Sequence, residues 1–205
     1  MDKVRHGLGF ERMLFFSDGV FAIAITLLVI DLRPAPGPFS LWTAAPHILA
    51  FCVSFFVIGQ YWMAHHELME TVQGYDRRLL SANLLFLAAV AFLPFPTGVV
   101  AVGNDRPSVV QFYALSLALV GVLLEALVFA AHRPGVMKPD LTRGATAHRL
   151  IGGLASPLVF CGTAVAANYL NHGALWLLLL LFPVRHALGR VGAVVERRIV
   201  GEATP

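Results

Sequence analysis

The sequence is poor in charged residues. They make up 13% of its 205 residues, about half of their share in an average soluble domain. Apolar residues make up 58% and fall in long blocks separated by short polar segments. A soluble protein of this composition would expose too much apolar surface to water. The composition therefore predicts an integral membrane protein.

Cysteine is scarce as well, which argues against a disulfide framework. The two cysteines, Cys52 and Cys161, both fall inside apolar blocks, where they are expected to act as small apolar residues. The formal net charge is only +3, and the basic residues stand beside the ends of the blocks. Basic residues at the ends of spans are typical of membrane proteins, where they set the orientation of the spans. We therefore predict that the partner is a lipid bilayer and not a nucleic acid.

Catalytic motifs are absent from the sequence. It contains no nucleophile elbow, no phosphate-binding glycine loop and no cysteine or histidine cluster at metal-binding spacing. The run His65, His66 and Glu67 lacks the H-E-x-x-H spacing, and adjacent histidines on a helix point about 100° apart. We therefore predict a protein that is not an enzyme and has no metal site and no cofactor.

Six blocks are long enough to cross a bilayer as helices. They cover residues 12–31, 42–64, 79–103, 108–131, 150–170 and 173–190. The first resembles a signal peptide, but its apolar run continues to Ile30, so we expect it to remain as a span. Pro94 and Pro96 predict a kink in the third. The expected fold is an all-α polytopic membrane protein, with one domain over 1–190 and a charged cytoplasmic tail over 191–205.

The basic residues predict the orientation of the six spans. With six helices, thirteen of the fifteen lysines and arginines fall on one side, and only Arg33 and Arg106 fall on the other. Loops rich in lysine and arginine stay in the cytoplasm. Both termini are therefore expected to be cytoplasmic.

Polar residues of several spans are expected at one depth, in the cytoplasmic half. Ser17 and Asp18 lie in the first span, Trp62 and His65 end the second, and Asn83 begins the third. A charge at this depth costs several kcal/mol unless it faces protein, water or a partner. Asp18 has Arg12 one and a half turns earlier, besides the donors on the neighbouring helices.

This cluster has two interpretations. A structural network would fasten the first helix to the second and third, and a functional site would make Asp18 a proton or ion site. The structural interpretation is favoured because a partnered carboxylate is the commoner solution to burial. Glu125, about two turns inside the fourth span, is either an interhelical acid or part of an ion pathway.

A stripe of residues follows Asp18 on one face of the first helix. The stripe comprises Gly19, Ala22, Ile23, Thr26, Leu27 and Ile30, at spacings of three and four residues. Small residues in such a stripe permit close helix packing. Alternatively, several copies of the helix would surround a pore, with rings of aliphatic side chains that gate by dewetting. Composition leaves both possibilities open.

The stretch "RMLFFSDGVFAIAITLL" closely resembles the first-helix signature of the transmembrane protein 175 family of potassium channels. The resemblance rests on Arg12, Phe16, Ser17 and Asp18 with the following "AIAITLL", and continues in "YWMAHH", Asn83 and "FLPFPT". These motifs lie in the first half of the chain. The later helices match the family in number and character only.

The resemblance implies a homotetrameric cation channel whose pore is lined by the first helix of each subunit. It implies a hydrophobic constriction of Ile23, Leu27 and Ile30, with Thr26 at a hydroxyl position linked to potassium preference. It also implies a network that anchors the first helix, formed by Arg12, Phe16, Ser17, Asp18, Trp62, His65 and Asn83. A "TVGYG" carbonyl filter is missing from the sequence, which agrees with the unusual pore of this family.

The leading hypothesis is a potassium-selective, leak-like channel in the plasma membrane of a prokaryote. Its partners would be further copies of itself, lipid and the permeant potassium ion. An alternative is a proton-conducting channel or transporter that uses Asp18, Glu125 and His65. A third hypothesis, of another class, is a non-conducting membrane scaffold or an intramembrane enzyme.

Overall fold

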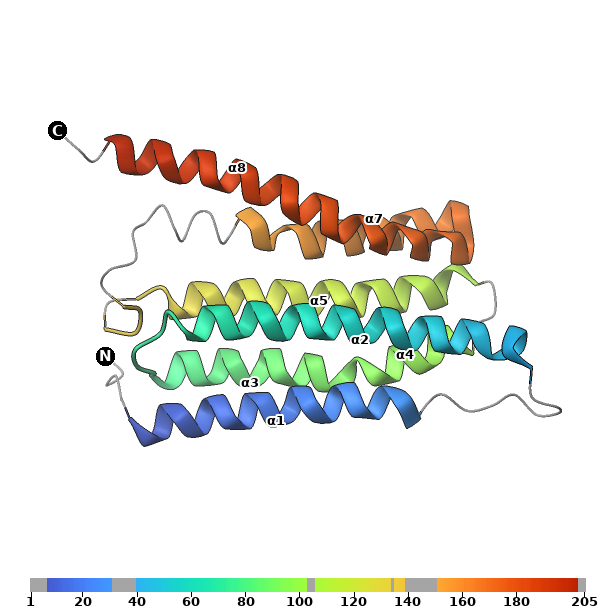
Figure 1. The fold of residues 1–205 in the computed structure, drawn as a ribbon, viewed down its shortest axis with the longest axis horizontal. Coiled ribbons are helices and arrows are strands. Elements are labelled where there is room, and N and C mark those ends of the chain that lie inside the picture. Colours follow the sequence, from blue (N-terminus) through green and yellow to red (C-terminus); the bar gives the residue numbers. More distant parts are fainter. Residues whose placement is uncertain (1–6, 31–39, 103–105, 134, 139–150, 203–205) are drawn as a thin grey trace.

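The chain folds into long helices that lie side by side (Figure 1). The structure is a computed structural model, and it describes residues 7–30, 40–102, 106–133, 135–138 and 151–202. Its elements are α1 (Leu8–Ile30), α2 (Leu41–Met69), α3 (Arg77–Phe92), α4 (Pro94–Ala101), α5 (Pro107–Ala131), α7 (Ala155–Leu170), the 3₁₀ helix η1 (Asn171–Leu180) and α8 (Leu181–Glu202). The predicted all-α class is confirmed.

Five stretches of the described chain are long and apolar enough to cross a membrane, namely Leu8–Ile30, His47–Met69, Arg77–Ala101, Pro107–Ala131 and Ile151–Leu170. They coincide with the first five predicted blocks. The protein is therefore a multi-pass membrane protein.

The sixth predicted block, 173–190, is also helical but is divided between η1 and α8. Asn171 has a φ of 49°, a backbone conformation that residues other than glycine rarely adopt, and the chain reverses there after α7. Pro183, Arg185 and Arg190 interrupt the apolar run. α8 continues past residue 190, where the sequence predicts the tail to begin, and this domain boundary stays a prediction.

The kink expected at the prolines of the third span lies at Leu93, between α3 and α4. Pro94 and Pro96 lie in the first turn of α4, where a missing N–H costs little. Leu93 donates its N–H to Val90 O in a tightened last turn of α3. A network joins α4 to its neighbours, since Ser54 Oγ lies 2.9 Å from Thr97 Oγ1 and 2.8 Å from Tyr113 Oη.

One end of the bundle, here called the α2–α3 end, holds the loop between α2 and α3. The C-terminus of α5 reaches the same end (Figure 1). Gln73 N donates to Val136 O at 2.8 Å, and Lys138 N donates to Thr71 O at 2.9 Å. Asp76 and Arg133 form a partly buried ion pair of 2.8 Å. The loop after α2 is thereby tied to the loop after α5.

The assignment of the α2–α3 end to the cytoplasm stays a prediction. Four of the thirteen basic residues on which this assignment rests, Lys3, Arg5, Arg143 and Arg149, lie outside the described residues, and so does Arg33 on the opposite side.

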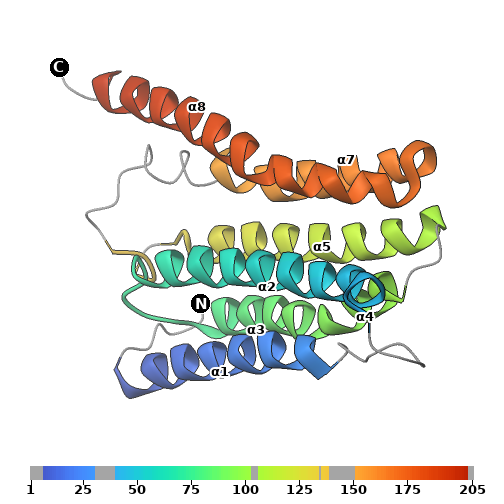
Figure 2. The same cartoon turned by 45° about the vertical axis from the view of Figure 1, so that its right-hand side comes forward.

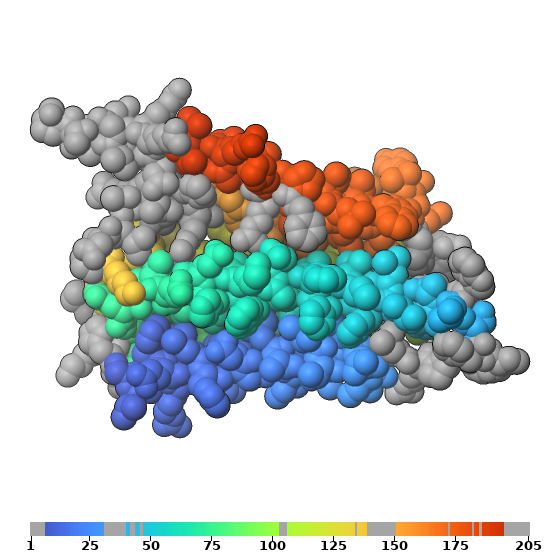
Figure 3. Space-filling model, viewed as in Figure 1, coloured from blue at the N-terminus to red at the C-terminus, as the bar shows by residue number. Residues whose placement is uncertain are grey.

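α1 lies at one edge of the molecule, with α2 and α3 as its main neighbours (Figures 1 and 2). One face of the helix is buried through Met13, Ser17, Phe21, Ala24 and Leu28. The outer face forms the lower border of the space-filling view, in blue (Figure 3). A helix that is apolar on all sides but buried on only one requires lipid or further protein around it.

Candidate functional site

Three buried polar side chains connect α1, α2 and α3. His65 Nε2 donates to Asn83 Oδ1 at 2.9 Å, and Asn83 Nδ2 donates to Ser17 Oγ at 3.0 Å. Ser17 in turn donates to Met13 O at 2.9 Å, within α1. All three side chains are almost inaccessible to solvent. The hydrogen bonds run in one direction, from His65 of α2 through Asn83 of α3 to Ser17 of α1, and end on a backbone carbonyl of α1.

Aromatic rings surround this polar series. The imidazole of His65 stacks on Phe86, with ring centroids 5.5 Å apart and an interplanar angle of 7°. Phe21 of α1 contacts both rings, at 5.7 Å from His65 and 5.9 Å from Phe86. An apolar enclosure strengthens a hydrogen bond and penalises a missing partner. The three helices are therefore held in one rotational setting.

Asp18 takes part in a separate, more exposed contact. Trp62 Nε1 donates to Asp18 Oδ1 at 2.9 Å. The Trp62 ring also stacks on His66, with centroids 5.5 Å apart. Of the three donors that the sequence offered on neighbouring helices, only Trp62 bonds Asp18, because His65 and Asn83 bond each other. This contact provides a second connection between α1 and α2.

Arg12 and Phe16 lie on the outer surface of α1. Arg12 makes no ion pair with Asp18 among the described residues, and Phe16 is exposed. Neither contacts the polar network inside one subunit, so their membership of it stays a prediction.

The predicted pore residues share the outer face of α1. Ile23, Leu27 and Ile30 are 61%, 39% and 58% exposed. Thr26, also exposed, donates its hydroxyl to Ile23 O at 2.9 Å. That hydrogen bond leaves the lone pairs of the Thr26 oxygen free to face a cation. The aliphatic side chains and the hydroxyl are accordingly available to a neighbouring copy, to lipid or to water.

The network of Ser54, Thr97 and Tyr113 was not anticipated from the sequence. Thr97 belongs to the quoted "FLPFPT" run, but Ser54 and Tyr113 stand alone in apolar blocks. The sequence could have been searched with the rule that a buried hydroxyl needs a hydrogen-bond partner. That rule favours contacts between the hydroxyls of neighbouring spans, here those of α2, α4 and α5.

The amino-acid sequence matches a described family in its first half. Residues 12–94 match the profile of "Endosomal/lysosomal potassium channel TMEM175". The resemblance to the TMEM175 family is confirmed. The matched region contains α2, α3 and α1 from Arg12 onward, and so every residue of the polar network and of the α1 stripe.

Individual TMEM175-like relatives extend the comparison. A potassium channel of Streptomyces collinus is 45% identical over 121 residues, which cover 55% of this chain and 59% of that protein. The human endosomal/lysosomal proton channel TMEM175 is 25% identical over 149 residues, covering 69% of this chain and 29% of that protein. This chain thus matches only part of the length of these relatives.

A solved structure covers nearly the whole TMEM175-like chain. The crystal structure of a lysosomal potassium-selective channel TMEM175 homolog from Chamaesiphon minutus superposes with a TM-score of 0.68 at 26% identity. The match covers 93% of this chain and 99% of the other. The likeness therefore extends to α5, α7 and α8, where the family profile does not reach.

Proposed function

We propose that four copies of this chain form a potassium-selective, leak-like channel whose pore is lined by α1. The observation that carries this proposal is the outer face of α1, which exposes Ile23, Thr26, Leu27 and Ile30 while the opposite face is fixed by buried hydrogen bonds. The names of the related bacterial potassium channels support the choice of ion.

The fixed rotation of α1 is what makes a pore of this kind possible. An aliphatic constriction excludes ions or admits them according to small changes of radius. Such control requires that each helix present the same side chains to the axis. The hydrogen bonds of Ser17, Asn83 and His65 supply this rotational constraint, two turns away from Ile23.

Selectivity needs a source other than backbone carbonyls, because α1 satisfies its carbonyls internally. A ring of Thr26 oxygens would replace some of the water around a potassium ion. Potassium is the permeant ion in this scheme and not a resident cofactor. We place the channel in the plasma membrane of a prokaryote with both termini cytoplasmic, as the distribution of basic residues favours.

The experiment that tests this function uses purified protein in liposomes under opposed potassium and sodium gradients. The reversal potential should lie near the potassium equilibrium potential. Thr26→Val, which removes the hydroxyl and keeps the shape, should move it toward zero, and Ile23→Ser should raise the conductance. Val122→Ser is the matched control, because Val122 is exposed on α5 and not on α1. Unchanged conductance and selectivity in both stripe variants would remove α1 from the pore.

A second candidate function is proton conduction. It is favoured by the polar groups of Asp18 and His65 within the spans and by the name of the human relative, a proton channel. Proton flux in potassium-free solution that disappears in Asp18→Asn, with the fold retained, would support it. Flux that needs potassium and survives this substitution would reject it.

A further inference from the structure

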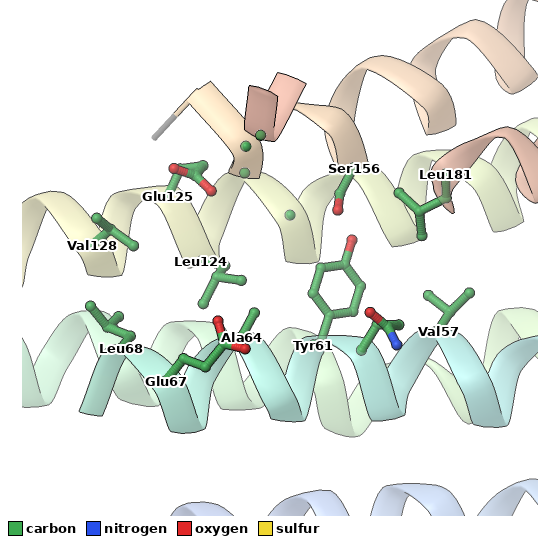
Figure 4. Close-up of a pocket in the computed structure, with 15 residues that line it drawn as sticks. Val57, Tyr61, Ala64, Glu67, Leu68, Leu124, Glu125, Val128, Ser156 and Leu181 are labelled. Carbon is green, nitrogen blue, oxygen red and sulfur yellow. The ribbon is translucent and has the colours of Figure 1, made fainter. Parts of the chain in front are cut away.

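A cavity of about 190 Å³ lies within the subunit, between α2, α5, α7 and α8 (Figure 4). It is on the side of α2 and α5 away from α1 (Figure 1). A volume of this size holds several water molecules or one small organic molecule. The cavity contains none of the predicted pore or network residues.

The polar groups of this cavity are acidic or neutral. Glu125 and Glu67 both line it, and the lining residues that the structure describes include no lysine, arginine or histidine. Glu125 Oε2 is buried and has no hydrogen-bond partner among the described residues. A carboxylate in a membrane span is costly unless a cation or a proton donor reaches it. The described residues thus leave one carboxyl oxygen of Glu125 without a hydrogen bond inside the cavity wall.

The position of Glu125 depends on a glycine of the opposing helix. A Cβ atom at Gly153 would overlap the carboxyl group of Glu125, so only glycine at this position leaves room for the carboxylate. Gly121, Gly152 and Gly189 also line the cavity. The absence of side chains at these positions keeps the space beside the carboxylate open.

The remaining walls combine hydroxyl oxygens with aliphatic groups. Tyr61 donates its hydroxyl to Leu117 O at 2.7 Å, and its oxygen has Ser156 and the backbone of Gly121 as further hydrogen-bond partners. Figure 4 shows the hydroxyls of Tyr61 and Ser156 pointing toward each other. Leu124 and Leu181 supply apolar surface. The cavity thus places the carboxyl group of Glu125 and the hydroxyl oxygen of Ser156 next to apolar contacts.

We propose that this cavity binds a small organic ammonium ion, with its charged group on Glu125 and its apolar part against Leu124 and Leu181. An ammonium group donates up to three hydrogen bonds, which suits an unpartnered carboxylate oxygen with further oxygens nearby. A bare metal ion fits less well, because the described residues contain no group of three or more histidine, cysteine or acidic side chains. The site is separate from the α1 pore and does not depend on conduction.

The test is binding of n-butylammonium to the purified, detergent-solubilised protein, followed by the thermal unfolding midpoint and by saturation-transfer NMR. Butylammonium chloride should raise the midpoint with saturation, whereas butanol and potassium chloride at equal concentration should not. Glu125→Gln should weaken butylammonium binding about tenfold, since it removes a charge-assisted hydrogen bond. Glu70→Gln should leave binding unchanged, because Glu70 is an acid at the end of α2 outside this cavity.

Four results would overturn the proposal. Equal binding by Glu125→Gln, or a loss in Glu67→Gln alone, would remove Glu125 as the contact. An equal shift with potassium chloride that Glu125→Gln abolishes would mean an inorganic cation site. Should Glu125→Gln fail to fold, Ser156→Cys in a background without Cys52 and Cys161 replaces it. Butylammonium must then slow modification of this cysteine by a thiosulfonate, and an unchanged rate would also overturn the proposal.

Discussion

Asn83 is the residue through which α1, α2 and α3 are connected. Its amide oxygen accepts from His65 and its amide nitrogen donates to Ser17. An ionised carboxylate only accepts hydrogen bonds and could not donate to Ser17 without being protonated. An uncharged amide is therefore suited to this buried position.

Asn83→Ala should lower the free energy of unfolding by about 1–2 kcal/mol, because the Nε2–H of His65 loses its buried acceptor. The measurement is thermal or denaturant unfolding of the detergent-solubilised protein. Asn168→Ala is the control, since Asn168 bonds Gln111 in an exposed pair at 3.1 Å and should change stability by less than about 0.5 kcal/mol. Equal effects of the two substitutions would contradict the central role of Asn83.

The sequence placed Asp18 correctly among polar neighbours but left its partner open. Arg12, the nearest cation along the chain, lies on the outer surface, and Trp62 provides the hydrogen bond. Sequence spacing gives the depth of a residue along a helix. It does not give the rotation of that helix against the next one, and rotation decides which of several donors at one depth makes the contact.

At the scale of elements, the ion pair of Asp76 and Arg133 joins the start of α3 to the end of α5. Asp76 also caps α3, because its Oδ1 accepts from Leu79 N at 2.9 Å. Arg133 additionally donates to Ala130 O. Asp76 therefore serves as a helix cap and as the anion of an interhelical ion pair.

Substitution of Asp76 by two different residues should separate these roles. Asp76→Asn keeps a good cap and removes the charge, and Asp76→Ala removes both, so the alanine variant should be less stable by about 1 kcal/mol, the usual cost of a lost cap. Unfolding midpoints of the two variants and of Arg133→Gln provide the comparison. Indistinguishable stabilities of Asp76→Asn and Asp76→Ala would show that the cap contributes nothing.

Close approach of α5 and α7 is concentrated at Gly121. A Cβ atom there would lie 3.2 Å from Pro157 Cδ and from Tyr61 Oη, and 3.3 Å from Ser156 Cβ. Gly162 of α7, by contrast, has no such neighbour within 4 Å. Small residues at an interface allow helix backbones to pack closely in a membrane.

Gly121→Leu should therefore destabilise the protein by about 1–3 kcal/mol, the cost of overpacking, while Gly162→Leu should be neutral. Unfolding of both variants in the same detergent gives the comparison. A Gly121→Leu protein as stable as Gly162→Leu would mean that α5 and α7 do not pack as closely as the structure has them.

Over the whole molecule, hydropathy was sufficient to predict the five spans, and the prolines predicted the kink at Leu93. It failed at boundaries where polar residues continue a helix. α2 runs to Met69, beyond the predicted end at 64, because Leu68 and Met69 are buried in the core and keep the helix in place after its two histidines. The predicted sixth span, 173–190, includes the junction of η1 and α8. Hydropathy measures the length of an apolar stretch and does not distinguish a 3₁₀ helix from an α-helix.

The proposed assembly into four copies makes different predictions for two neighbouring residues of α1. In the proposed tetramer Ile30 faces the axis, where the α1 helices of neighbouring copies meet, and Leu28 faces the interior of its own subunit. The two residues differ sharply in exposure, 58% for Ile30 and 1% for Leu28. They lie only two positions apart, so membrane depth is nearly the same for both.

Ile30→Cys should therefore form disulfide-linked dimers on mild oxidation in membranes, in a background without Cys52 and Cys161, whereas Leu28→Cys should not. Light scattering of the purified, non-oxidised protein should give a mass four times that of the 22.2 kDa chain, after correction for detergent. Cross-linking of both cysteines would indicate random collision in the membrane. A monomeric mass without cross-linking at Ile30 would mean that the exposed face of α1 meets lipid, and the pore would then have to be sought inside the subunit.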